Sequence, residues 1–254
     1  MARSLMKYIY ISLGLLAIDA AISMGLVTRM VVFLHFWGAG PFEIANPPGT
    51  TPSTYMLNGH PAGLLVDQGH TTNGAGGTAL VLVGFGGILA LWLEHRSRTK
   101  HGKSSPVFYV WAITVVLSWL LTLTALIYTY VVTAMTQNQS IDPAVAVQNA
   151  GQPYPDDWWT PETWYTAVLG LTLSNESDYD LIRNNLRLMR GWRYNLIPLF
   201  ILGFILMDLV ILEVLRTRKA GAKGGYGRAP SGEHHQIEKD NKGQMDAAQH
   251  PLNA

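Results

Sequence analysis

Two carboxylic acids stand inside stretches of the sequence that are otherwise apolar. Asp19 lies within residues 8–28, and Asp208 lies within residues 195–215, whose second acid, Glu213, stands beside the basic residues that end this stretch. A carboxyl group inside an apolar helix can act as a general acid, hold a cation or share a proton with a second acid. Asp19 and Asp208 are therefore the candidate catalytic residues, whereas Glu213 is expected only to pair with a nearby arginine.

The same two acids also have a purely structural interpretation. If both chain termini lie on one side of a membrane, each acid lies roughly 12 to 16 Å from that end of its helix, at 1.5 Å per residue. A charged group at such a depth costs about 2.5 to 3.5 kcal/mol on insertion scales. Hydrogen bonds to hydroxyl groups of a neighbouring helix, for which Thr122, Thr124 and Tyr128 are available, would offset this cost and serve packing alone.

Other residue clusters carry weaker chemical signals. Glu43, His60, Asp67 and His70 could bind a metal ion, but a spacing of ten between the histidines fits neither one helix face nor a tight turn, so we expect no metal site. The chain has no cysteine, which excludes disulfides, thiolate metal sites and a cysteine nucleophile. Residues 102–104 and 74–79 resemble ends of nucleotide-binding motifs but lack the required glycine or preceding strand. No cofactor is expected.

Aromatic side chains gather in one polar segment, at Trp158, Trp159, Trp164 and Tyr165. Such residues are enriched where a membrane meets water, so they are expected to anchor the segment at that interface. The functional alternative is a platform that binds a sugar or a lipid.

The elements that must position these residues are transmembrane helices. Residues 104–141 form a run of 38 without an Asp, Glu, Lys, Arg or His. A helix over residues 107–135 would be about 43 Å long, more than the roughly 30 Å of a bilayer's hydrocarbon core. A soluble helix of that length would show a polar stripe, and none can be drawn here. The run predicts a membrane span, and the lipid bilayer is the expected surroundings of the protein.

Three further spans are predicted over residues 8–28, 74–93 and 195–215, which makes the fold class an all-α four-helix transmembrane bundle. A cleaved signal peptide is the alternative for the first span. Residues 38–73 are predicted to be a loop, and residues 136–194 to be a long outer loop with short helices that lie at the membrane interface, the last of them over residues 177–193. Residues 219–254 are predicted to be a disordered tail.

The second predicted span is rich in small residues, which allow helix backbones to approach closely. Ala75 with Ala79 and Gly86 with Ala90 recur at spacings of four. This span is therefore the expected centre of helix packing and the expected surface for lateral contacts.

The basic residues predict the orientation. With both termini in the cytosol, that side holds 13 Lys and Arg residues and the other side five, as the positive-inside rule favours. The two glycosylation sequons, at Asn138 and Asn175, then lie outside, in the long second loop. We therefore expect an N-glycosylated protein of the secretory pathway or the plasma membrane. A net charge of +1 without a basic block predicts no nucleic-acid partner.

The arrangement of four spans, a short basic turn and a larger second outer loop, over residues 8–218, resembles that of tetraspan membrane proteins, including MARVEL-type and claudin-like organisers. The claudin pattern of Gly-Leu-Trp and two cysteines has only Trp37-Gly38 as a counterpart, and no functional residue is carried over. The resemblance implies a non-enzymatic organiser or scaffold that contacts other proteins or further copies of itself. The alternatives are a membrane enzyme or accessory protein acting on a lipophilic metabolite, and a proton- or cation-coupled transporter subunit.

Overall fold

A computed structural model describes residues 5–155 and 158–225 of the protein, the last six of them by their backbone alone. The chain divides into two units, residues 1–211 and 212–254. The second unit holds the end of the last helix as far as Gly225, and the first unit holds everything discussed below unless stated otherwise.

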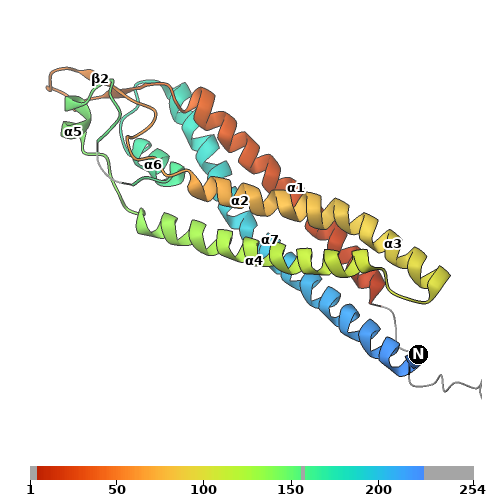
Figure 1. Ribbon diagram of the computed structural model, residues 1–254. Helices are drawn as coiled ribbons and strands as arrows, with labels where there is room; N and C mark the ends of the chain where they lie inside the picture. Colours follow the sequence, from red (N-terminus) through yellow and green to blue (C-terminus); the bar gives the residue numbers. More distant parts are fainter. Residues whose placement is uncertain (1–4, 156–157, 226–254) are drawn as a thin grey trace, which may run out of the picture. The chain divides into compact units, whose positions relative to one another are not determined.

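Four helical segments are long and apolar enough to cross a membrane, which confirms the predicted all-α, four-span class of fold (Figure 1). The first is α1 (Met6–Val32) with a π-helical extension, η1 (Phe33–Trp37). The second runs without a break through α2 (Asp67–Gly77), the π-helical η2 (Thr78–Phe85) and α3 (Gly86–His101). The third is α4 (Pro106–Met135), and the fourth is α7 (Glu176–Gly225).

The second span begins at Asp67, inside the stretch that the sequence predicts to be a loop. The glycines and threonines of this stretch have low helix propensity, which hides the helix from a sequence pattern. Packing against α1 compensates, because a Cβ at Gly76 would lie only 3.4 Å from the Met24 Sδ. The Thr72 hydroxyl also turns inward and donates to the Gln68 carbonyl oxygen at 2.7 Å, so this polar turn adds no unpaired hydroxyl to the interface.

The predicted surface-lying helix over residues 177–193 is not a separate element, because α7 runs continuously from Glu176 through this region and past Pro198. Its apolar stripe is real but contacts protein, with Ile182 and Met189 at 0% and 1% exposure. A hydrophobic stripe is buried by lipid or by another protein surface with the same energetic benefit, so the pattern alone could not choose between them.

The turn between α3 and α4 is held by a buried acid as well as by helix-capping residues. Gly102 ends α3 with a φ of +65°, and the Ser105 hydroxyl caps α4 by accepting from the Val107 N–H. Glu94, fully buried, accepts from the Ser105 N–H at 2.6 Å and pairs with Arg98 at 2.6 Å. This short basic connection is therefore a rigid corner.

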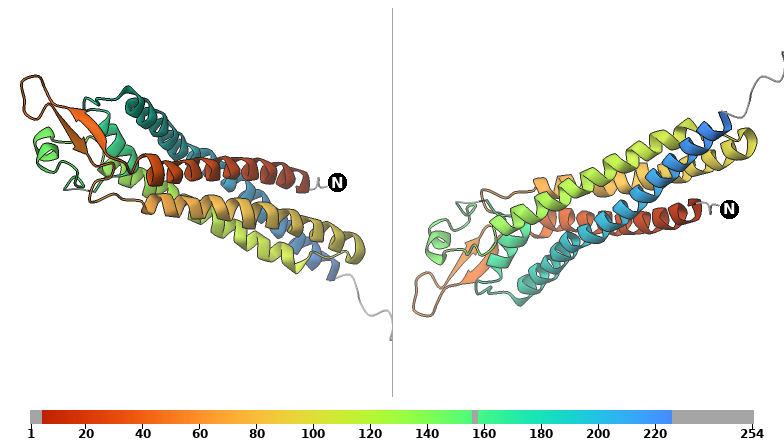
Figure 2. Two further views of the ribbon diagram at one scale, coloured as in Figure 1. Left: turned by 90° about the horizontal axis from the view of Figure 1, so that it is seen from above. Right: turned by 90° about the horizontal axis from the view of Figure 1, so that it is seen from below.

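The two loops that the sequence predicts to lie outside the cytosol fold together into one packed region. We name it the outer module after that prediction, and it comprises residues 33–66, 136–155 and 158–175 with the first turns of α7. It contains an antiparallel hairpin, β1 (Phe42–Ala45) and β2 (Thr54–Leu57), and two short helices, α5 (Pro143–Gln148) and α6 (Pro161–Val168). It lies at the end of the first unit where α1 and α4 finish and α7 begins (Figure 2).

Backbone hydrogen bonds join the two loops across the module. The Ala45 N–H donates to the Thr172 carbonyl oxygen at 2.8 Å, and the Leu65 N–H donates to that of Trp159 at 2.7 Å. The predicted loop over residues 38–73 is therefore half of a folded unit rather than an irregular connection.

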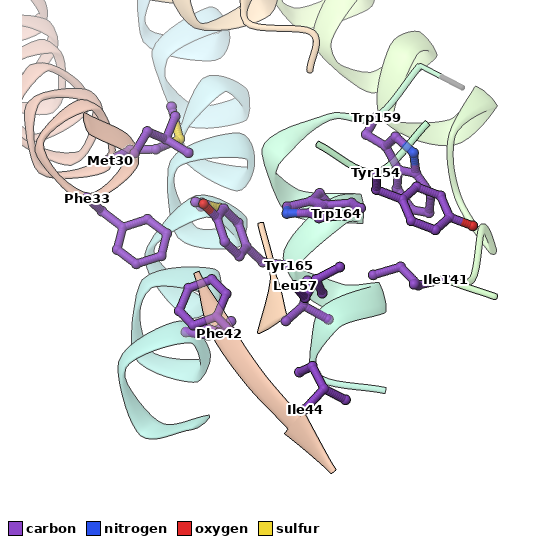
Figure 3. Packing of buried hydrophobic residues seen from close by; sticks show 14 of the residues in the cluster. Met30, Phe33, Phe42, Ile44, Leu57, Ile141, Tyr154, Trp159, Trp164 and Tyr165 are labelled. Carbon is purple, nitrogen blue, oxygen red and sulfur yellow. The ribbon is translucent and has the colours of Figure 1, made fainter. Parts of the chain in front are cut away.

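One hydrophobic core fills the outer module and reaches the ends of α1 and α7. Its members come from every part of the module, and the labelled ones converge in Figure 3: Met30, Phe33, Phe42, Ile44, Leu57, Ile141, Tyr154, Trp159, Trp164 and Tyr165. Because α1 and α7 supply side chains to it, the core fixes the module to these spans.

The predicted disordered tail lies largely outside the described residues, since these end at Gly225. Within them α7 continues to Gly225, so the tail cannot begin at residue 219 as the sequence suggested.

Candidate functional site

The aromatic cluster belongs to the core of the outer module. Trp159, Trp164 and Tyr165 are 2%, 0% and 0% exposed, whereas Trp158 is 71% exposed. Three of the four predicted interfacial residues can therefore neither anchor the segment in lipid nor form a surface platform. The prediction was wrong because an indole or phenol ring is equally suited to a protein core in which its polar atom finds a partner.

The polar atoms of Trp164 and Tyr165 do find partners in the first of the two loops. The Trp164 Nε1–H donates to the Gly59 carbonyl oxygen at 2.7 Å, and the Tyr165 hydroxyl donates to that of Gly38 at 3.0 Å. A Cβ at Gly59 would overlap the carbonyl oxygens of Gly38 and Gly40. A glycine is therefore required at position 59, where the backbone lies against residues 38–40. Hydrogen bonds from Trp164 and Tyr165 of α6 hold these two segments together.

The small residues of the second span face the inside of the chain. Ala75, Ala79 and Ala90 are 0%, 2% and 1% exposed, and Gly86 is partly buried. They therefore do not offer a lateral surface to another protein. The tightest contact lies one residue from the predicted pair, because a Cβ at Gly87 would lie 2.9 Å from both Leu13 Cδ2 and Trp111 Cζ2. No spacing rule distinguishes Gly87 from its neighbouring glycines.

Asp19 lies on α1, partly buried, with its Oδ2 shielded from solvent and without a hydrogen-bond partner among the described residues. Two of the three hydroxyl groups expected to serve it are used elsewhere. Thr122 and Thr124 each donate to a carbonyl oxygen of their own helix at 2.9 Å. Asp19 therefore has a carboxyl oxygen that is shielded from solvent and receives no hydrogen bond from the described part of the chain.

Asp208 lies on the exposed side of α7. It forms no hydrogen bond or ion pair with any part of the chain that the structure describes, and it does not share a proton with Asp19 through a hydrogen bond. The four residues three or four positions away on the same face are all apolar and exposed: Phe204 is 42%, Ile205 43%, Ile211 38% and Leu212 53% exposed. Asp208 is therefore a single carboxyl group on an exposed apolar surface of α7.

The remaining sequence candidates are separate. No group of three acidic or histidine side chains in residues 5–155 and 158–225 has the arrangement of a metal site. Asn138 and Asn175 are both exposed, the first just beyond the end of α4 and the second just before α7. Asn175 also receives hydrogen bonds from the Ser177 N–H and hydroxyl groups.

Fold and residues together define a class: a multi-pass α-helical integral membrane protein of four spans with a packed module at one end. Comparisons with protein-family models, with curated proteins and with solved structures find no match to this chain.

Proposed function

We propose that this membrane protein is a non-enzymatic organiser that binds another transmembrane protein laterally through the face of α7 around Asp208. The observation that carries this proposal is the exposed carboxyl group of Asp208 within an apolar helix surface. Facing lipid, such a group costs about 2.5 to 3.5 kcal/mol. A partner helix that pairs with it recovers this cost, and the apolar side chains around it supply the packing surface.

The chemistry of the partner follows from the same residue. A buried carboxylate is best paired with Lys or Arg. Residues 8–28, 74–93, 107–135 and 195–215 contain no Lys, Arg or His, so a second copy of the chain has no cation to offer at this depth. The partner is therefore a different protein, with a basic residue inside a transmembrane helix.

The number of spans and the distribution of basic residues support the same class of function. A four-span arrangement is that of tetraspan proteins, and its resemblance to MARVEL-type and claudin-like organisers supports the same class of function. The charge distribution supports cytosolic termini, with the outer module outside the cytosol in the secretory pathway or at the plasma membrane. The rigid module would then hold α1 and α7 at a constant spacing while α7 binds its partner.

Site-specific photocrosslinking in native membranes tests the proposal. A photoreactive residue at Phe204, one turn from Asp208, is expected to capture a membrane protein at a segment that contains Lys or Arg within its span. Asp208→Leu should lower this capture at least about tenfold at equal abundance, since an ion pair worth more than 1.4 kcal/mol is lost.

The control position is Val110, which is 65% exposed on α4 and should capture no such partner. An adduct between two copies of the chain, or capture that Asp208→Leu leaves unchanged, would contradict the proposed contact.

A further inference from the structure

A cavity of about 330 Å³ lies where the spans meet the outer module. Its wall is formed by the end of α1 with η1, by the first turns of α2 and of α6, and by Met189 and Trp192 of α7. The wall is mostly apolar, with Val27 and Leu34 among the other lining residues. Exposed lining residues of α1 and α2, namely Val31, His70 and Asn73, mark its mouth. Its size is at the lower end of the range for small-molecule sites.

Three residues of this wall carry a shielded polar atom that has no hydrogen-bond partner among the described residues: His60 Nε2, Gln68 Oε1 and Trp192 Nε1. Gln68 and Trp192 are only 3% and 5% exposed. A buried polar group without a partner costs about 1 to 3 kcal/mol. Three such groups around one cavity are unusual, and each needs an explanation. A bound ligand that both donates and accepts hydrogen bonds would explain them, because it could pair with these atoms after small side-chain rotations.

The charges around the cavity favour an uncharged ligand. Glu162 is the acid in its wall, and it is paired outside the cavity with Arg193 at 3.1 Å and Arg190 at 3.5 Å. Burial raises the pKa of Glu162, and the two arginines oppose this shift. Burial lowers the pKa of His60, so its imidazole is neutral at neutral pH. The wall therefore offers no uncompensated charge to a phosphate or an ammonium group.

Two residues near the cavity are typical of the level where a membrane lipid keeps its polar group. The Arg29 guanidinium stacks over the Trp37 ring, with 4.8 Å from Cζ to the ring centroid, and both residues belong to the stretch of α1 and η1 that lines the cavity. An arginine and a tryptophan at a helix end mark the interface of a membrane with water.

We propose that this cavity binds a lipophilic molecule whose polar group is a single uncharged hydroxyl, such as a sterol or a long-chain alcohol. The hydroxyl donates to Gln68 Oε1 and accepts from the Trp192 indole N–H, and the apolar body fills the space between α1, α2 and α7. This site is independent of the α7 face around Asp208, so either proposal can fail without the other.

Photolabelling of the purified full-length protein in nanodiscs tests the inference. The probe is a sterol that carries a diazirine and a free hydroxyl, and its matched partner is the methyl ether of the same sterol, which cannot donate. We expect the hydroxyl probe to label peptides around residues 27–35 or 68–73. Because one hydrogen bond is worth about a factor of ten in affinity, the methyl ether should label about tenfold less.

Gln68→Leu and Trp192→Phe should each reduce labelling by a similar factor. The control is Tyr55→Phe, because the Tyr55 hydroxyl is also buried and has no hydrogen-bond partner among the described residues, but does not line the cavity. Gel filtration establishes that each variant is folded, and the two probes on the wild-type protein require no variant at all.

Mass spectrometry of the lipids that copurify with the protein identifies the source of the ligand. A membrane sterol or a smaller hydroxylated metabolite supports the inference, provided that Gln68→Leu lowers its amount. Equal labelling by both probes, labelling that is confined to the lipid-facing helix surfaces, or recovery of an anionic phospholipid from the cavity would overturn it.

Discussion

The Trp164 ring is enclosed by the outer core, while its N–H group bonds a carbonyl oxygen 105 residues earlier in the chain. Side-chain type predicts only that such a ring has an apolar body and a polar atom. Contacts between distant segments of the chain decide which residues pack against the apolar ring and which group accepts its hydrogen bond. The same applies to Tyr165, whose hydroxyl reaches the first outer loop from α6.

Trp164→Phe should therefore destabilise the outer module. It leaves the buried Gly59 carbonyl oxygen unpartnered, at about 1 to 3 kcal/mol, and it opens a cavity. A lower midpoint of thermal unfolding, followed by the fluorescence of the detergent-solubilised protein, is the expected result. Trp158→Phe is the matched control, because that exposed residue should change stability by less than about 0.5 kcal/mol. Equal effects of the two substitutions would show that the hydrogen bond contributes nothing.

His60 should make stability depend on pH. Burial lowers the pKa of His60 in the folded protein, the backbone of Leu34 opposes this shift through a hydrogen bond, and the neighbouring His35 adds to the lowering. The unfolded chain therefore binds a proton more readily, beginning near pH 6.5. The contribution of His60 to the free energy of unfolding is therefore fully present above that pH. It is lost as the pH falls toward the lower pKa of His60 in the folded state.

Unfolding curves of the wild type and of His60→Gln between pH 7.5 and 5.5 measure this contribution. The wild type and the variant share all other residues of the cavity wall, so the difference between their curves reports the substitution at His60. We expect the wild type to lose more stability on acidification than the variant. Parallel curves would mean that His60 titrates as freely in the folded protein as in the unfolded chain.

At the scale of whole elements, the second span shows where a small-residue pattern succeeds and where it stops. The pattern indicates that a backbone approaches closely somewhere along residues 74–93. The position of closest approach depends on which side chains α1 and α4 place opposite each glycine, and these are Leu13 and Trp111 at Gly87. An isolated helix contains no information about this.

Two single-methyl substitutions separate the adjacent glycines. Gly87→Ala should destabilise the bundle by about 1 to 3 kcal/mol, because the Trp111 ring and Leu13 must move. Gly86→Ala should be neutral or slightly stabilising, since the nearest atom to its Cβ, the Val81 carbonyl oxygen, would be 3.8 Å away. Thermal unfolding in one detergent compares them, and a larger loss for Gly86→Ala would contradict the packing described here.

At the scale of the whole molecule, orientation is the property to measure. Asn138 and Asn175 are both exposed and belong to one loop. If that loop faces the secretory lumen, treatment with an endoglycosidase should raise gel mobility. The shift should halve in Asn138→Gln or Asn175→Gln and disappear in the double variant. Asn149→Gln, which alters no sequon, is the control. A wild-type protein without any shift would remove this support for an outer location of the module.

The sequence by itself determined that the chain has membrane-spanning helices in a lipid bilayer, and that there are four of them. Residues 104–141 lack charge, and no contact between helices is needed for such a run to prefer lipid. Hydrophobicity is a local quantity, so it can be summed along the chain. It therefore predicted four helices and located Asp19 and Asp208 within two of them.

Only the tertiary structure decided what each helix face contacts. It brought two loops, predicted to be irregular, into one core, turned the stripe of Ile182 and Met189 toward protein, and left Asp208 exposed while shielding Asp19. These outcomes depend on pairs of residues tens of positions apart. Periodicity identifies a face that must be covered, but the free energy of covering it is nearly the same for lipid, for a loop and for another helix.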